Sequence, residues 1–186
     1  PCPLRVPEDP SRVGTYSKPI QYDYCSIGPW AYARDMRPTK FAGYVHDNYG
    51  IENFLDSEAR KQLYLASNLA LAFQSKENIA AQHVSQRVYE ALAYGCVTFS
   101  NSPAASEQTD GIVIYASSKE DLEAKMDYYL RHPEECDKKR QEGYEFVRKF
   151  GTHDFTVQLF LQTISASFKN IHSSSQETLA ASRFLS

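Results

Sequence analysis

Short apolar runs of strand length constrain the fold of this chain more than any other feature. The runs are 22–28 (YDYCSIG), 40–45 (KFAGYV), 68–73 (NLALAF), 96–100 (CVTFS) and 111–115 (GIVIY). Continuous apolar runs predict strands that are buried on both faces, which is typical of a parallel sheet covered by helices on each side. We therefore expect a parallel sheet of about five strands.

Segments with helical periodicity alternate with these runs. We expect Ser57 to cap the first helix, Ser85 to cap the second, Gly95 to end it, and Ser117 with Glu120 to form a capping box before the third. The expected helices cover 57–66, 85–94, 117–132, 133–150 and 154–168. The alternation predicts an α/β fold with a Rossmann-like, doubly wound parallel sheet, which binds ligands at the carboxyl ends of its strands.

The two ends of the chain differ from this pattern. Residues 1–20 begin with four prolines in ten residues, so we expect a proline-rich linker or the remnant of a preceding segment. Residues 169–186 are serine-rich and polar, which predicts a surface tail. The Rossmann-like domain is therefore expected to span 21–168.

Composition excludes several classes of protein. A net charge of -3 argues against a nucleic-acid binder, and no apolar run approaches the ~20 residues that span a membrane. The four cysteines form no CxxC pair, so neither a zinc site nor a disulfide framework is indicated; they are Cys2, Cys25, Cys96 and Cys136. We expect a reduced cytoplasmic protein.

Polar residues follow two of the predicted strands. Gly28 ends the first and precedes Arg34, which indicates either a diphosphate site or a glycine turn before a solvated basic face (Arg34, Arg37 and Lys40). The loop after 68–73 contains Ser75 and is long enough to fold over a ligand. His83, later in that loop, fits a surface or capping group better than a catalytic one.

The helix at 85–94 (SQRVYEALAY) carries Arg87 and Glu90 one turn apart, away from its apolar positions. One interpretation is a surface ion pair of little energetic consequence. The other is that Arg87 meets a phosphate and Glu90 accepts hydrogen bonds from ribose hydroxyls, because such a helix begins at the ligand crevice. Spacing alone leaves both interpretations open.

Several segments together indicate a family. Residues 87–95 match the pattern R-V-x-E-A-L-A-x-G. Three further segments resemble the same family and occur in the family's order along the chain: 22–34 (YDYCSIGPWAYAR), 58–73 (EARKQLYLASNLALAF) and 111–155. In these segments the chain resembles the C-terminal, donor-binding half of GT-B glycosyltransferases, most nearly the group of CgeB-like glycosyltransferases. The resemblance covers about residues 21 to 165.

The resemblance implies a nucleotide-sugar donor site. Glu90 then binds the donor ribose, Arg87 lies on the same helix, and Gly28 and Arg34 lie near the phosphate-facing loop. Gln82 departs from the second glutamate that retaining members often carry, so the stereochemistry stays open. The family also uses an N-terminal half for the acceptor, and this chain contains no second sheet that fits it.

Two functions follow as expectations. The first is a glycosyltransferase, or its donor-binding half, that moves a sugar from a nucleotide-diphosphate sugar to a glycan or other hydroxyl acceptor. The alternative is a non-catalytic nucleotide-sugar-binding or structural module of GT-B origin. Neither a metal nor a cofactor is expected, since the chain contains no acidic DxD pair and no G-x-G-x-x-G fingerprint. No catalytic residue is identified.

Overall fold

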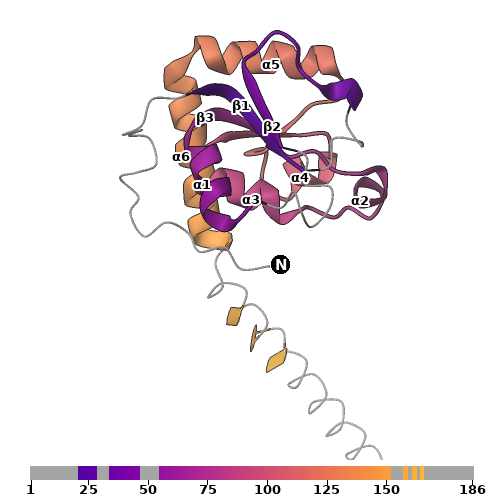
Figure 1. Ribbon diagram of the computed structural model, residues 1–186. Coiled ribbons are helices and arrows are strands. Elements are labelled where there is room, and N and C mark those ends of the chain that lie inside the picture. Colours follow the sequence, from indigo (N-terminus) through magenta and orange to yellow (C-terminus); the bar gives the residue numbers. More distant parts are fainter. Residues whose placement is uncertain are drawn as a thin grey trace, which may run out of the picture.

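The computed structural model describes residues 21–28, 34–46 and 55–151, together with the helical pairs 157–158, 161–162 and 164–165. Five parallel strands form one sheet in the order β2-β1-β3-β4-β5, enclosed by two helical layers (Figure 1). The strands are β1 (Tyr22–Ile27), β2 (Gly43–His46), β3 (Ser67–Leu71), β4 (Val97–Ser100) and β5 (Ile114–Tyr115). The predicted α/β class and parallel sheet are confirmed.

The helices connect and flank these strands. In chain order they are η3 (Arg34–Met36), α1 (Ser57–Leu65), α2 (Lys76–Ala80), α3 (Gln86–Ala93), α4 (Pro103–Glu107), α5 (Lys119–Arg131) and α6 (Pro133–Phe150). The strand order reverses between β1 and β3, so the carboxyl ends of these two strands flank the topological switch point of the sheet. No helix in the described part of the chain is long and apolar enough to cross a membrane.

Alternate residues of each central strand point into different layers. Leu69 and Leu71 pack with α5 on one face, whereas Cys25, Ile27 and Ala70 pack with α1 and α3 on the other. Both sets are buried. This two-sided burial explains why β1 and β3 carry apolar residues on both faces.

Helix α6 runs from the α5 layer to the α3 layer along one edge of the sheet (Figure 1). Cys136 near its start packs with the α5 cluster, and Val147 near its end packs with α3. Between them, Arg140 donates a hydrogen bond to Asn68 at the amino end of β3. Because α6 covers the amino ends of the strands, their carboxyl ends are left to the loops that follow the strands.

Two helix caps are displaced by one residue from the predicted positions. Asp56, rather than Ser57, accepts a hydrogen bond of 2.7 Å from the backbone N–H of Ala59. At α5, Ser118 rather than Ser117 accepts from the N–H of Asp121, at 3.2 Å. Ser117 instead donates to the Asp121 carboxylate, so the predicted capping box with Glu120 is wrong.

Other differences arise from local hydrogen bonds. Thr109 accepts from the N–H groups of Ile112 and Val113, which holds this segment in a turn and shortens β5. The predicted strand 40–45 begins later, because Ala42 N–H donates to the Asp23 carboxylate instead of to a strand. Helices α2 and α4 were not predicted. Most of the expected helix 154–168, with 1–20 and 169–186, lies outside the described residues.

Candidate functional site

The start of α3 meets the end of β1 at the carboxyl edge of the sheet. Arg87, the second residue of α3, donates Nη1 to the carbonyl oxygen of Ile27 at 2.6 Å. Gly28 follows with a φ of +143°, and a Cβ at this position would overlap the Arg87 guanidinium. A glycine is therefore required by both the backbone conformation and the available space. The structure thus brings together Gly28 and Arg87, two of the predicted site residues.

Arg87 is largely withdrawn from water. Burial lowers the pKa of its guanidinium, and the negative charge of Glu90 opposes that shift. A desolvated cation gains more from an opposite charge than a solvated one does, because screening by water is weaker. The position therefore favours contact with an anion.

Glu90 lies one turn further along α3 and is only 8% exposed. Its Oε1 accepts from Arg60 Nη2 of α1 at 3.3 Å, and Arg60 Nη1 donates to the carbonyl oxygen of Leu55 at 2.9 Å. Within the part of the chain that the structure describes, Oε2 of Glu90 has no hydrogen-bond partner. These contacts do not match a surface ion pair between Arg87 and Glu90.

The contact between α1 and α3 continues one turn beyond this pair. Tyr64 of α1 stacks on Tyr94 at the end of α3, with ring centroids 6.0 Å apart and planes inclined by 16°. Burial raises the pKa of Tyr64 well above its usual value, with smaller contributions from Cys25 and Glu90. The stacked rings fix the register of the two helices, and this register sets Arg60 opposite Glu90.

A buried polar cluster joins the carboxyl ends of β3 and β4 to the start of α3. Gln74 N–H donates to Asn101 Oδ1 at 2.7 Å, and Gln74 Nε2 donates to the hydroxyl of Ser85 at 3.1 Å. Two buried atoms of the cluster, Gln74 Oε1 and Ser102 Oγ, have no hydrogen-bond partner. Ser85 is the N-cap of α3, as predicted, yet its side chain makes no capping bond. The start of α3 therefore retains donors for a ligand.

The other predicted site residues take different positions. Ser75 adjoins Gln74, but its hydroxyl caps α2 by accepting from Asn78 N–H at 3.3 Å. Arg34 is exposed at the start of η3, and no contact among the described residues joins it to the other four. Gln82 and His83 are both exposed, and Gln82 has a φ of +52°. Gly28, Arg87 and Glu90 therefore form the centre of the site, and Arg34 lies apart from them.

Sequence reasoning missed Arg60, Gln74 and Ser102. Gln74 directly follows the predicted strand 68–73, so its place at a carboxyl end was a usable signal. Arg60 gave no signal, because its contact with Glu90 depends on how α1 packs against α3. In the described ranges, no group of three or more His, Cys, Asp or Glu side chains is arranged to hold a metal ion.

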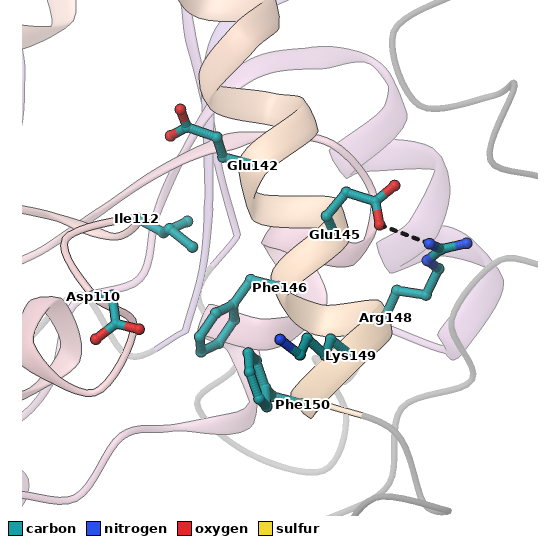
Figure 2. Close-up of a pocket in the computed structure, with 8 residues that line it drawn as sticks. All are labelled: Asp110, Ile112, Glu142, Glu145, Phe146, Arg148, Lys149 and Phe150. Atoms are coloured by element: carbon teal, nitrogen blue, oxygen red, sulfur yellow. Dashed lines mark ion pairs between the residues drawn. The ribbon is translucent and has the colours of Figure 1, made fainter.

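A hollow at the end of α6 combines aromatic and charged side chains, but it does not involve the site residues. Figure 2 shows Phe146 and Phe150 on its apolar side, facing Ile112 and Asp110 of the α4–β5 turn. Its charges are used locally. Glu145 pairs with Arg148 at 2.9 Å, and Lys149 Nζ lies 4.7 Å from the centre of the Phe150 ring. The hollow therefore offers no convergent set of polar groups for a nucleotide.

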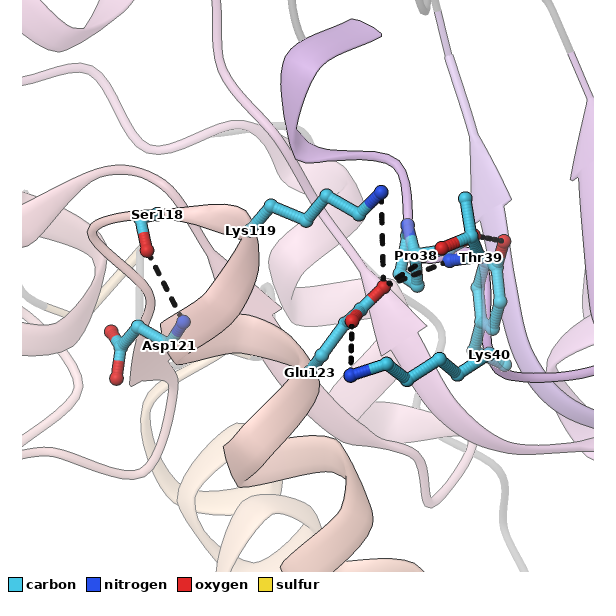
Figure 3. Close-up of polar contacts among 8 residues, drawn as sticks. Pro38, Thr39, Lys40, Ser118, Lys119, Asp121 and Glu123 are labelled. Atoms are coloured by element: carbon cyan, nitrogen blue, oxygen red, sulfur yellow. Dashed lines mark hydrogen bonds and ion pairs between the residues drawn. The ribbon is translucent and has the colours of Figure 1, made fainter.

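A second carboxylate, that of Glu123, is buried on α5, which packs on the face of the sheet opposite α1 and α3. Figure 3 shows its polar contacts. Glu123 of α5 accepts from the N–H and hydroxyl of Thr39 at 2.9 and 3.3 Å, and pairs with Lys40 Nζ at 3.1 Å and Lys119 Nζ at 3.9 Å. The Thr39 N–H, followed by Lys40, lowers the pKa of this carboxyl group. Glu123 thereby anchors the segment before β2 to α5.

Comparison with known proteins gives one match. A family model described as glycosyl transferase-like matches residues 21–162, a range that contains all five strands and the start of α3. Arg87 and Glu90 both lie within it. No curated protein and no solved structure is significantly similar to the chain.

Proposed function

The chain belongs to the glycosyl transferase-like family, and from that premise we propose that it is a glycosyltransferase or its donor-binding half. It transfers a sugar from a nucleotide-diphosphate sugar to an acceptor hydroxyl. The domain corresponds to the C-terminal half of a GT-B enzyme of the CgeB-like group. The observation that carries this proposal is the buried Glu90 carboxylate, which has one unpartnered oxygen next to the carboxyl edge of the sheet.

Glu90 binds the donor ribose in this proposal. Its Oε1 is engaged by Arg60, whereas Oε2 is available to accept from ribose hydroxyls. Hydrogen bonds to a charged acceptor contribute on the order of 1.5–3 kcal/mol each. Oε2 is not sealed from solvent, so a ribose hydroxyl can reach it.

The diphosphate lies at the start of α3. One Nη1 hydrogen bond of Arg87 is used by Ile27, and a guanidinium has four further N–H donors for phosphate oxygens. The uncapped first turn of α3 adds backbone N–H groups, and both stabilise the negative charge of a leaving diphosphate without requiring a metal. Gly28 acts by admitting the Arg87 side chain. Ser75 and Arg34 supply additional contacts to the donor.

The acceptor and the catalytic base come from outside the described residues in this proposal. An N-terminal acceptor domain, either on a longer chain or on a partner, closes over the donor and presents the acceptor hydroxyl. If the protein is instead a non-catalytic module of GT-B origin, it binds the donor and never turns it over. The two cases differ in turnover and not in binding.

Calorimetric titration with UDP, GDP and dTDP, followed by a donor-hydrolysis assay, tests the proposal. We expect one of the three nucleotides to bind and Arg87→Lys to weaken it about tenfold, because an ammonium cannot reproduce the planar fork of donors. Arg131→Lys is the matched control, since Arg131 forms an exposed pair with Asp127 on α5. Binding without hydrolysis would favour the module, and no binding of any nucleotide would refute the proposal.

A further inference from the structure

We propose that Arg60 is a positioning residue that holds the Glu90 carboxylate in the orientation needed by the donor. This role rests on the proposed function of Glu90. Arg60 is on α1, not on the helix that begins at the crevice, and it donates to Glu90. It therefore acts through Glu90.

The Arg60 guanidinium is held between two acceptors. Nη1 donates to the Leu55 carbonyl oxygen at 2.9 Å, and Nη2 donates to Glu90 Oε1 at 3.3 Å, with only 19% of the side chain exposed. Because the guanidinium is planar, its hydrogen bond to the Leu55 carbonyl determines the direction in which Nη2 meets the Glu90 carboxylate. A lysine has a single ammonium group and cannot span both acceptors in the same way.

Glu90 needs this restraint because a second cation is nearby. Arg87 lies one turn earlier on α3, and the Glu90 charge already acts on it, as the opposing effect on the Arg87 pKa indicates. Without Arg60, the carboxylate would turn toward Arg87 and form a pair at i and i+3. That pair would occupy the two groups that the donor is proposed to use.

The restraint also lowers the entropic cost of binding. A glutamate side chain that is ordered before the ligand arrives does not lose rotamer freedom when it binds. The stacked rings of Tyr64 and Tyr94 lie one turn from Arg60 and Glu90, so the same helix contact that buries the rings sets the distance between the charges. Arg60 therefore pre-organises one oxygen, Oε1, and leaves Oε2 to the ligand.

A double-mutant cycle tests this role with the nucleotide that the wild type binds best among UDP, GDP and dTDP. We expect Arg60→Met to weaken binding about tenfold in the wild type and to change it less than about twofold in a Glu90→Gln background. Arg60→Lys should recover only part of the affinity. Lys61→Met is the matched control, because Lys61 is the next cation of α1 and pairs with the exposed Glu58; it should leave binding unchanged.

Each outcome of the cycle is decisive. Unfolding in urea shows whether Arg60→Met is folded. If it is not, Arg60→Lys takes its place in the cycle. If Glu90→Gln weakens binding and Arg60→Met does not, the role of Arg60 is refuted while the proposed function survives. If Arg60→Met has the same effect in both backgrounds, Arg60 does not act through Glu90 and the inference also fails. If neither the wild type nor any variant binds a nucleotide, the proposed function itself fails.

Discussion

Two glutamates lie buried on opposite faces of the same sheet, and their surroundings differ sharply. The side chains of Glu123 and Glu90 are similarly withdrawn from water, with 7% and 11% exposed. Glu123 has a backbone N–H, a hydroxyl and two ammonium groups around it, and both oxygens are engaged. Glu90 has one guanidinium partner at one oxygen. Two carboxylates that are buried to a similar extent therefore differ in how many hydrogen-bond and ion-pair partners they have.

The difference separates a structural role from a binding role. A carboxylate removed from water is tolerated when hydrogen bonds and opposite charges replace its hydration. The protein supplies all of these to Glu123, which joins α5 to the segment before β2. It supplies fewer to Glu90, which lies near the switch point of the sheet. We therefore interpret Glu123 as a residue of the fold and Glu90 as a residue of the donor site.

The largest effect is expected at Gly28. Gly28→Ala forces a positive φ on a residue with a Cβ and displaces Arg87. We therefore expect the unfolding free energy to fall by about 3 kcal/mol and nucleotide binding to be lost. Gly111→Ala is the control, because Gly111 also has a positive φ of 76° but open space around it. Urea unfolding should give a loss of about 1–2 kcal/mol there, from backbone strain alone. Equal losses of unfolding free energy at both positions would mean that the Arg87 side chain moves aside at no cost.

Glu123→Gln should produce the opposite combination. Removing the charge between Thr39 and Lys40 should destabilise the fold by about 2 kcal/mol in urea unfolding, because hydrogen bonds to a charged group are lost. Asp127→Asn, which removes an exposed ion pair on the same helix, should change stability by less than about 0.5 kcal/mol. If the two variants were equally stable, the anchoring role of Glu123 would be wrong.

The stability supplied by Glu123 should depend on pH. Its pKa in the folded protein is lowered below its ordinary value of 4.5, so its contribution is complete above that value and is lost as the pH falls through the lower folded value. The difference in unfolding free energy between wild type and Glu123→Gln should thus be full at neutral pH and shrink in acid. A difference that stayed constant down to the acid limit of folding would contradict this assignment.

The smallest effect is expected from chelation. If the free oxygen of Glu90 accepts hydroxyl hydrogen bonds, EDTA should leave nucleotide affinity unchanged in calorimetry. Loss of binding in EDTA, followed by recovery with magnesium or manganese, would instead show that a metal ion takes part in binding the nucleotide. The contrast between the two glutamates would then concern metal binding rather than ribose.

Local patterns predicted more of the fold than of the carboxylate environments. The sheet was predictable because burial on both faces leaves short, mostly apolar runs in its central strands, and Pro133 marked the start of α6. Helices α2 and α4 have five residues each, too few for an apolar period to repeat. Glu90 was identified because it follows a predicted ligand loop on a helix with a family pattern.

Long-range contacts explain what could not be predicted. Glu123 looks like an ordinary polar position of α5, and its burial depends on Thr39, 84 residues earlier in the chain. Arg60 meets Glu90 only after α1 and α3 have packed, across 30 residues. The apolar periodicity of α5 does not indicate the role of Glu123, and that of α1 does not indicate the role of Arg60. The hydrogen-bond partners of these two carboxylates therefore depend on tertiary packing, which the local sequence does not record.

The most direct test is a calorimetric comparison of Glu90→Gln and Glu123→Gln with the same nucleoside diphosphate. We expect Glu90→Gln to weaken binding roughly 10- to 100-fold and Glu123→Gln to keep the affinity within about twofold of wild type. Pyrophosphate, which lacks the ribose, should bind wild type and Glu90→Gln alike. Equal nucleotide affinity of wild type and Glu90→Gln would exclude Glu90 from the donor site and leave it a role in packing α1 against α3.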